Sequence, residues 1–277
     1  MGDRKIVKGG FVIDSERLSG KVFVLTEAWE DKYNRIFNQK DVIGIRLSKS
    51  AGWKGGGLAF LGDLPPLKSV EVYDWETKDI SPLYKHEQIE HIGLECQFGK
   101  FDFTQFPKLT HLGITWRPSA KTLFDCTNLR YLNVSRFPYE DLKELSKLSN
   151  LERLVLQSRK IISLNGLNCL LNLQELDLAF CTSLKDICAL EAAEKLEVLE
   201  FTSCKKIVEI DPMHHLSQLK RLLMENCGII RSVKPLSSCL KLKEAYFINT
   251  RIEDGDSSVF LDLPDIRKVV SPNSLRV

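Results

Sequence analysis

Three cysteines recur at equal spacing in the C-terminal half of the chain, a regularity that could serve a metal ion or a redox reaction. Cys181, Cys204 and Cys227 follow one another at intervals of 23 residues. Zinc sites usually take their cysteines in close pairs, because one short loop then supplies two ligands. The wide spacing therefore favours structural thiols that recur with the fold, and we predict no metal.

Two histidines form a second candidate site. His91 and His111, with Glu95 near them in sequence, are residue types that ligate transition metals. A complete set of four ligands is not visible. We therefore interpret the two rings as exposed residues that contact a partner, with a metal site as the alternative.

A glycine-rich segment from Gly52 to Gly57 has the composition of a phosphate-binding loop but not the order G-x-x-x-x-G-K-[ST]. We interpret it as a glycine-rich bulge in the first return, with a mobile Trp53 that contacts a partner as the alternative. The chain shows no nucleophile elbow, kinase signature or zinc-protease helix. The sequence thus predicts no catalytic residue and no cofactor.

Along most of the chain a motif, L-x-x-L-x-L, recurs at spacings of 20 to 23 residues. Its first residues are Leu67, Ile89, Leu109, Leu129, Leu151, Leu173, Leu196, Leu219 and Leu242. Positions four and six are apolar in every copy and alternate with mostly polar residues, the pattern of a strand with one buried face. A weaker copy starts at Val42 and a truncated one at Ile266, which makes about eleven coils.

This pattern, over residues 42–271, resembles the leucine-rich-repeat superfamily. Residues 151–173 are similar to the 22-residue class that includes internalins, and the three copies from Leu173 onward look like cysteine-containing variants. The resemblance implies an α/β solenoid with a curved parallel sheet on the concave face and short helical or 3-10 returns on the convex face. It also implies that Cys181, Cys204 and Cys227, at position nine, hydrogen-bond the turn that leaves each strand.

Residues 1–41 do not fit the repeat. Apolar runs at 11–13 and 22–25, followed by aromatic and apolar residues at helical spacing in 29–37, predict two strands and an amphipathic helix. We expect this segment to cap the first coil, because a solenoid exposes its core at both ends. The predicted domains are a cap, 1–41, and a solenoid, 42–277, whose last coil is truncated.

Composition limits the classes of partner. Lys and Arg number 39 and Asp and Glu 37, so a net charge of +2 provides no bulk field for nucleic acid or an anionic membrane. The first residues lack the features of a secretory signal, and no stretch is long and apolar enough to span a bilayer. We expect a cytoplasmic protein with its eight cysteines reduced.

Positions three, five and seven of each predicted strand point to the concave face. An aromatic and imidazole cluster lies toward the N-terminal half, beside a depression at Gly93 and Gly113. Its members are Tyr73, His91, His111, Trp116 and Tyr131. A cluster of carboxylates, which Arg221 relieves only in part, lies toward the C-terminal half. Its members are Glu175, Asp177, Glu200, Glu225 and Glu244.

We predict from these clusters a non-catalytic scaffold that binds a partner protein on its concave face, with aromatic anchors and an acidic patch for a basic segment. One such role is an immunity protein that inhibits a basic toxin, by analogy of fold. The alternative is a regulatory or effector subunit that docks on a signalling protein. An enzyme is disfavoured because the repeat leaves no catalytic constellation.

Overall fold

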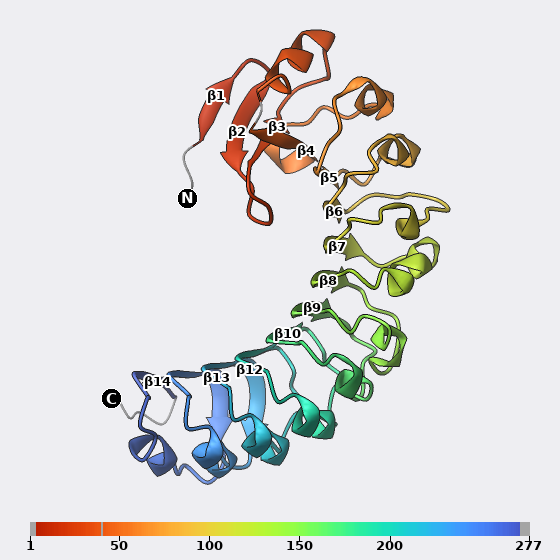
Figure 1. Cartoon of the computed structure of the whole chain (residues 1–277). Coiled ribbons are helices and arrows are strands. Elements are labelled where there is room, and N and C mark those ends of the chain that lie inside the picture. The colour runs from red at the N-terminus through yellow and green to blue at the C-terminus, as the bar shows by residue number, and fades with distance from the viewer. Residues whose placement is uncertain (1–3, 40, 272–277) are drawn as a thin grey trace. The chain divides into compact units, whose positions relative to one another are not determined.

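The computed structural model describes residues 4–39 and 41–271 and divides into two compact units, Met1–Leu129 and Arg130–Val277. Within each unit the strands pair in chain order and lie along one side of the ribbon, with the returns on the other side (Figure 1).

The first unit begins with two antiparallel pairings, β1 with β2 and β2 with β3, and continues as a parallel sheet. Its strands are β1 (Lys5–Val7), β2 (Gly10–Asp14), β3 (Lys21–Leu25), β4 (Val42–Ser48), β5 (Ser69–Tyr73), β6 (His91–Leu94) and β7 (His111–Thr115). Its 3-10 helices are η1 (Asp31–Ile36), η2 (Lys49–Ala51), η3 (Ala59–Asp63), η4 (Ser81–Lys85), η5 (Phe103–Gln105) and η6 (Pro118–Asp125).

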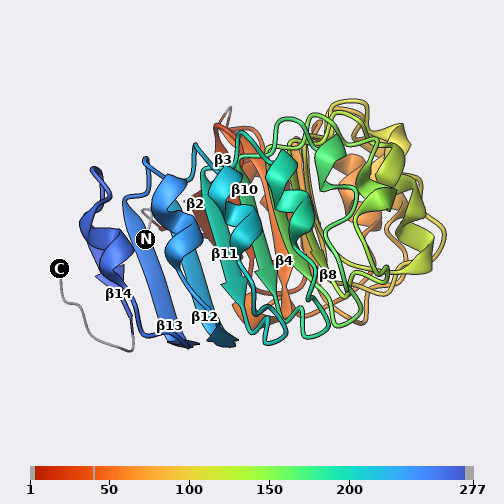
Figure 2. The same ribbon diagram turned by 90° about the horizontal axis from the view of Figure 1, so that it is seen from below.

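The described strands of the second unit pair in parallel, and β10–β13 lie side by side in Figure 2. Its strands are β8 (Tyr131–Ser135), β9 (Arg153–Gln157), β10 (Glu175–Ala179), β11 (Val198–Thr202), β12 (Arg221–Ile230), β13 (Glu244–Ile252) and β14 (Lys268–Val270). Its 3-10 helices are η7 (Lys143–Leu145), η8 (Leu167–Cys169), η9 (Cys188–Ala192), η10 (Asp211–His215), η11 (Lys234–Ser238) and η12 (Ser258–Leu261).

The strand register confirms the repeat. Leu176 of β10 pairs with Leu154 of β9 and with Leu199 of β11, so position four forms a continuous row of buried side chains. On the returns, Leu190 and Met213 are also fully buried and close the core from the other side. Each coil buries its apolar face only against its neighbours, which is why stacking stabilises the fold.

Every helix in residues 4–39 and 41–271 is a 3-10 segment of eight residues or fewer. A coil of about 22 residues leaves too little chain between two strands for a long α-helix, and 3-10 pieces are typically this short. Among these described residues, no helix has the length and apolar character needed to cross a bilayer.

Strands β4 to β14 supply the eleven coils that the sequence predicts. In residues 1–41 the two predicted strands are present as β2 and β3, but the expected amphipathic helix is the 3-10 helix η1. Moreover β3 pairs in parallel with β4 in the register of the repeat, with Phe23 opposite Ile45 and Leu25 opposite Leu47. The segment from β3 through η1 therefore has the layout of a coil. A cap limited to 1–41 stays a prediction, and residues 272–277 lie outside the described part.

Candidate binding surface

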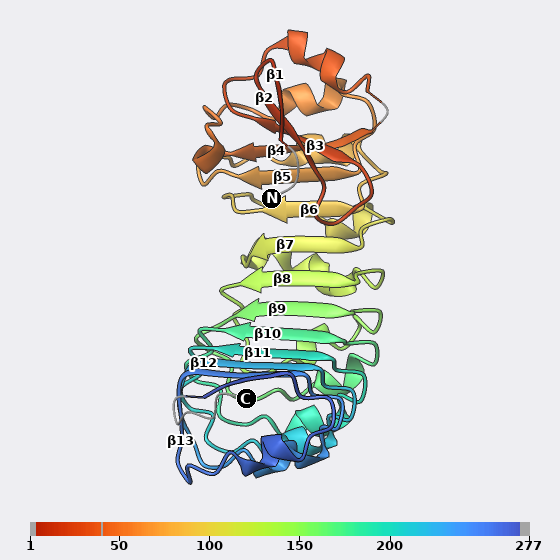
Figure 3. The ribbon, with the colours of Figure 1, turned by 90° about the vertical axis from the view of Figure 1, so that its left-hand side faces the viewer.

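Each sheet has one face that packs on the returns and an opposite face, called here the open face, that carries positions three, five and seven. In the first unit the turn between β2 and β3, residues 15–20, lies over the open face beside β4–β6 (Figure 3). Ser69, Glu71 and His91 point to this face, yet they are 0%, 2% and 7% exposed. The chain therefore covers part of this face itself.

Under that turn lies a closed network of polar side chains. Arg46 donates two hydrogen bonds to Glu71, at 2.9 Å and 3.1 Å, and the Tyr73 hydroxyl donates to Glu71 Oε2 at 2.8 Å. Burial and the Glu71 carboxylate raise the pKa of Tyr73 well above its ordinary value. Because the buried charges satisfy one another, the network is structural, and Tyr73 is committed to it.

The interpretation of His91 as an exposed contact residue is wrong. Its Nδ1 lies 3.0 Å from Ser69 Oγ, and its ring meets that of His111 with centroids 6.3 Å apart. Burial, aided by the positive charges of His111, Arg17 and Arg46, lowers the pKa of His91 to about 3. The ring stays neutral at physiological pH. His111 is half-buried, and its Nδ1 lies 2.9 Å from Thr110 Oγ1.

The expected depression is partly filled. A side chain at Gly93 would meet the Tyr73 hydroxyl at 2.6 Å, so the glycine makes room for that ring. Nothing lies within 4 Å of the equivalent point at Gly113, where the surface is open. The alternative of a mobile Trp53 is wrong, because Trp53 is 2% exposed and its Nε1 donates to Asp74 Oδ2 at 3.2 Å.

The two remaining aromatic residues of the predicted cluster lie in different units. Trp116 is half-buried and stacks on Phe124, with ring centroids 5.3 Å apart. Tyr131, at the start of β8 in the second unit, is only 8% exposed, and the Arg153 guanidinium lies 5.7 Å from its ring centroid. Tyr131 is therefore mainly a packing residue.

All five predicted carboxylates lie half-buried on the open face of the second unit. They are partly paired, contrary to the expectation of a largely uncompensated patch. Arg153 Nη1 lies 3.1 Å from Glu175 Oε2, and Arg221 Nε lies 3.3 Å from Glu200 Oε1. Glu244 accepts a hydrogen bond of 3.1 Å from Tyr246. Within the described residues, Asp177 and Glu225 have no side-chain ion pair or hydrogen bond.

Asp177 and Glu200 stand directly opposite each other on β10 and β11. Burial and the Glu200 charge raise the pKa of Asp177, and Arg153 opposes this effect. Adjacent like charges in a parallel pair destabilise the sheet. A cation placed between these carboxylates would relieve that repulsion.

The sequence clusters omit an aromatic residue on the same face. Tyr246 of β13 is half-buried between the Arg221 guanidinium, 5.5 Å from the ring centroid, and the Lys268 ammonium at 5.3 Å. Ile248 on the same strand is 37% exposed. The repeat already places Tyr246 at position five, but only the strand register shows that Arg221 and Lys268 lie beside its ring. Such a held aromatic ring is a typical binding anchor.

The cysteine ladder is confirmed as structural. Cys204 Sγ lies 3.3 Å from the Leu178 carbonyl oxygen and 3.6 Å from that of Thr202, and Cys227 repeats this geometry one coil later. Thr250 takes the same place in the next coil with its hydroxyl. Hydrogen bonding to Cys181 and burial raise the pKa of Cys204 to about 12, which disfavours a reactive thiolate.

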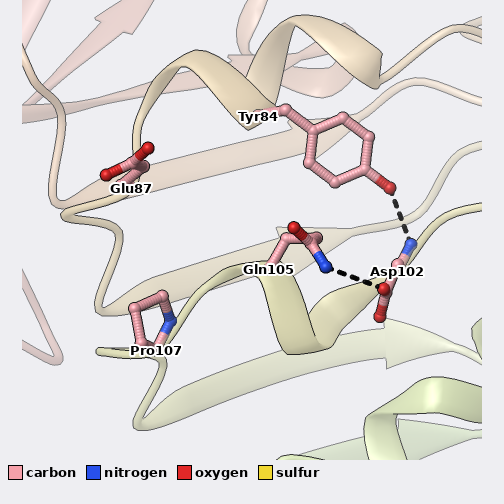
Figure 4. A pocket seen from close by; sticks show the side chains of 5 residues that line it. All are labelled: Tyr84, Glu87, Asp102, Gln105 and Pro107. Atoms are coloured by element: carbon pink, nitrogen blue, oxygen red, sulfur yellow. Dashed lines mark hydrogen bonds between the residues drawn. The ribbon is translucent and has the colours of Figure 1, made fainter.

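All eight cysteines are free thiols, and the described residues contain no group of three or more His, Cys, Asp or Glu side chains arranged to hold a metal. A pocket of 520 Å³ lies on the returns of the first unit, lined by Tyr84, Glu87, Asp102, Gln105 and Pro107 (Figure 4). Its polar groups bond to one another: the Asp102 amide donates to the Tyr84 hydroxyl at 2.7 Å, and Gln105 donates to Asp102 at 3.0 Å. They form no catalytic arrangement.

No protein-family model matches the sequence, and no curated protein matches it significantly. Solved structures do. A chain of the Toll–Spätzle complex of Drosophila is 14% identical over 97% of this chain and 37% of its own length, with a TM-score of 0.60. A leucine-rich-repeat protein of Leptospira interrogans is 16% identical over 85% and 68%, with a TM-score of 0.52. An internalin of Listeria monocytogenes is 15% identical over 94% and 88%, with a TM-score of 0.49. The first two likenesses show that the chain has the leucine-rich-repeat fold.

Proposed function

We propose that this chain of leucine-rich-repeat fold is a non-catalytic binding protein that holds a partner protein on the open face of the unit Arg130–Val277. The observation that supports this most is the opposed pair Asp177 and Glu200, half-buried on the open face. A purely structural sheet gains nothing from such a pair.

The proposed partner contributes a basic segment. A lysine or arginine side chain between Asp177 and Glu200 would convert a like-charge contact into two charge-assisted hydrogen bonds. Tyr246, with its ring held between two cations, would supply apolar contact area three strands from Asp177. Affinity would then come mainly from the aromatic contact, and orientation and rate from the carboxylates.

The finer role that we propose is inhibition of a basic protein, such as a toxin whose working surface is covered in the complex. We place this activity in the reducing cytoplasm, and the free thiols support that location. A regulatory subunit would use the same face. Inhibition would be favoured if a neighbouring gene encodes a toxin and co-expression of this chain suppresses its toxicity.

Differential capture tests the site. The wild type, the variant Asp177→Lys/Glu200→Lys and the control Glu191→Lys/Glu194→Lys would be immobilised and exposed to the native lysate. The control makes the same charge change on an exposed return. We expect a basic protein that is retained by the wild type and the control but lost from the open-face variant. If the two variants retain the same proteins, the working surface is elsewhere. Circular dichroism verifies that both variants fold.

A further inference from the structure

The turns that leave the strands of the second unit carry a second charged surface. In the six coils that start at Leu129 to Leu242, positions eight to eleven contain no Asp or Glu. These positions follow β8–β11 and form the last part of β12 and β13. The arrows of β8–β10 point toward this edge, to the left in Figure 3. We call the exposed side chains at these positions the strand-exit ridge. Its cations include Arg159, Lys160, Lys205, Lys206 and Arg251.

These five cations lack anionic partners. Within the part of the chain that the structure describes, no carboxylate lies within salt-bridge distance of any of them. Some other cations of the same unit are paired, as Arg130 is with Glu152 and Lys220 with Glu197. A row of unpaired like charges repels itself. Five such cations along an edge whose positions eight to eleven carry no carboxylate point to an anionic partner.

Phe180 lies in the middle of the ridge, in a backbone conformation and at an exposure that are both unfavourable for phenylalanine. Its φ of 55° is left-handed, a conformation that costs a bulky L-residue free energy. In four other coils the same left-handed position holds Arg136, Ser203, Asn226 and Asn249, all of them polar residues. Phe180 is also 51% exposed. Neither backbone strain nor solubility explains this residue, whereas contact with a partner does.

The ridge is continuous. Phe180 N donates to the Thr202 carbonyl at 2.7 Å, and Ser203 N donates to that of Glu225 at 2.8 Å, so successive turns are tied together. Ile229, 45% exposed, lies opposite Arg251. Cations thus lie just beyond β9 and β11 and near the end of β13, with an exposed apolar residue just beyond β10 and near the end of β12. Because strands lie ~4.8 Å apart, each kind of residue recurs about every 10 Å.

We propose that the strand-exit ridge docks an acidic amphipathic α-helix of a partner protein. In an α-helix, residues i and i+7 lie ~10.5 Å apart on one face, with i+3 or i+4 between them. Carboxylates at i, i+7 and i+14 with apolar residues between them match the ridge in charge and in spacing. Single-stranded nucleic acid is the weaker fit, since it binds on several stacking aromatic rings, and among the described residues of the ridge only Phe180 is an exposed ring. This surface is separate from the open face, so the two proposals fail independently.

The test uses a fluorescein-labelled helical peptide of about 18 residues with Glu at i, i+7 and i+14 and Leu at i+3 and i+10. Anisotropy at low salt measures its binding to the whole protein. We expect binding about tenfold tighter than that of a scrambled peptide, and a loss of about tenfold in Lys205→Gln/Lys206→Gln and in Phe180→Ser. Lys195→Gln/Lys241→Gln, which removes equal charge before the strands begin, should bind within about twofold of wild type.

Any of three results would overturn the proposal. The first is that the designed peptide binds no better than the scrambled one, and the second is that the ridge variants bind it as tightly as the control variant does. The third is that an oligothymidine of similar length binds more tightly than the peptide, which would make the ridge a nucleic-acid surface.

Discussion

Replacing Asp177 by Asn should stabilise the protein at neutral pH. The change keeps the shape of the side chain and removes one charge from the opposed pair with Glu200. Burial and the Glu200 charge raise the pKa of Asp177 above its usual 3.8 in the folded state. The folded state therefore binds this proton more tightly than the unfolded chain does, and ionisation of Asp177 costs folding free energy.

The magnitude follows from the pair. Like charges on neighbouring strands destabilise by ~0.2–1 kcal/mol, so the free energy of unfolding of Asp177→Asn should exceed that of wild type by about that amount at pH 7. Below pH 3.8 the aspartate is protonated in both states, and the gain should vanish. It should grow as the pH rises through the folded-state pKa and then remain constant.

Urea unfolding at several pH values measures the effect. Glu175→Gln is the matched control, because it lies two residues away on the same face but gives up an ion pair of 3.1 Å with Arg153. Both side chains of that pair are more than 40% exposed, so its loss should change stability by at most ~1 kcal/mol and in the unfavourable direction. The reasoning is refuted if Asp177→Asn is less stable than wild type at pH 7, or if its gain persists at pH 3.

Three further outcomes are expected. Leu176→Ala and Leu178→Ala, both fully buried, should each lower the free energy of unfolding by ~2–5 kcal/mol, whereas Leu171→Ala, 66% exposed, should change it by less than ~0.5 kcal/mol; equal urea midpoints would show that the register is wrong. Cys204→Ala should lower the free energy of unfolding by ~0.5–1.5 kcal/mol, and Cys204→Ser should lower it by less, because serine can hydrogen-bond the same carbonyls. Elemental analysis of wild type should find no stoichiometric zinc. The pKa of His91 is near 6.5 in the unfolded chain and near 3 in the folded state. The free energy of unfolding of wild type should therefore decrease as the pH is lowered from 6.5 to 3. A His91→Gln variant that loses stability as steeply would contradict this.

Core positions could be predicted because burial follows from period alone. Leu154, Leu176 and Leu199 recur at 22 and 23 residues, and the structure stacks them in register. A strand with a period of two must turn one set of side chains inward, and the apolar set is the one that gains. The same logic located the cysteine ladder, since position nine recurs with the core.

The open face could be predicted in direction but not in exposure. Alternation places Glu71 and His91 away from the returns, but it cannot reveal that residues 15–20 fold back over them. Nor does it reveal which charges pair: Arg153 meets Glu175 because both occupy position three of neighbouring strands, a contact between residues far apart in sequence. The burial of Trp53 escaped the sequence for a similar reason, because its hydrogen-bond partner Asp74 belongs to the next coil.

Net charge misleads most in a repeat protein. A sum of +2 argues against a bulk field, yet each coil projects position five and position ten in different directions, so the repeat sorts opposite charges onto different surfaces of one unit. Asp177 and Glu200 lie on the open face, whereas Lys160 and Lys205 lie on the strand-exit ridge. Charged partners respond to the local potential within a Debye length, ~8 Å at physiological ionic strength, and not to the total. The exclusion of anionic partners by composition therefore does not extend to the ridge, and electrostatic expectations for a solenoid should be drawn column by column.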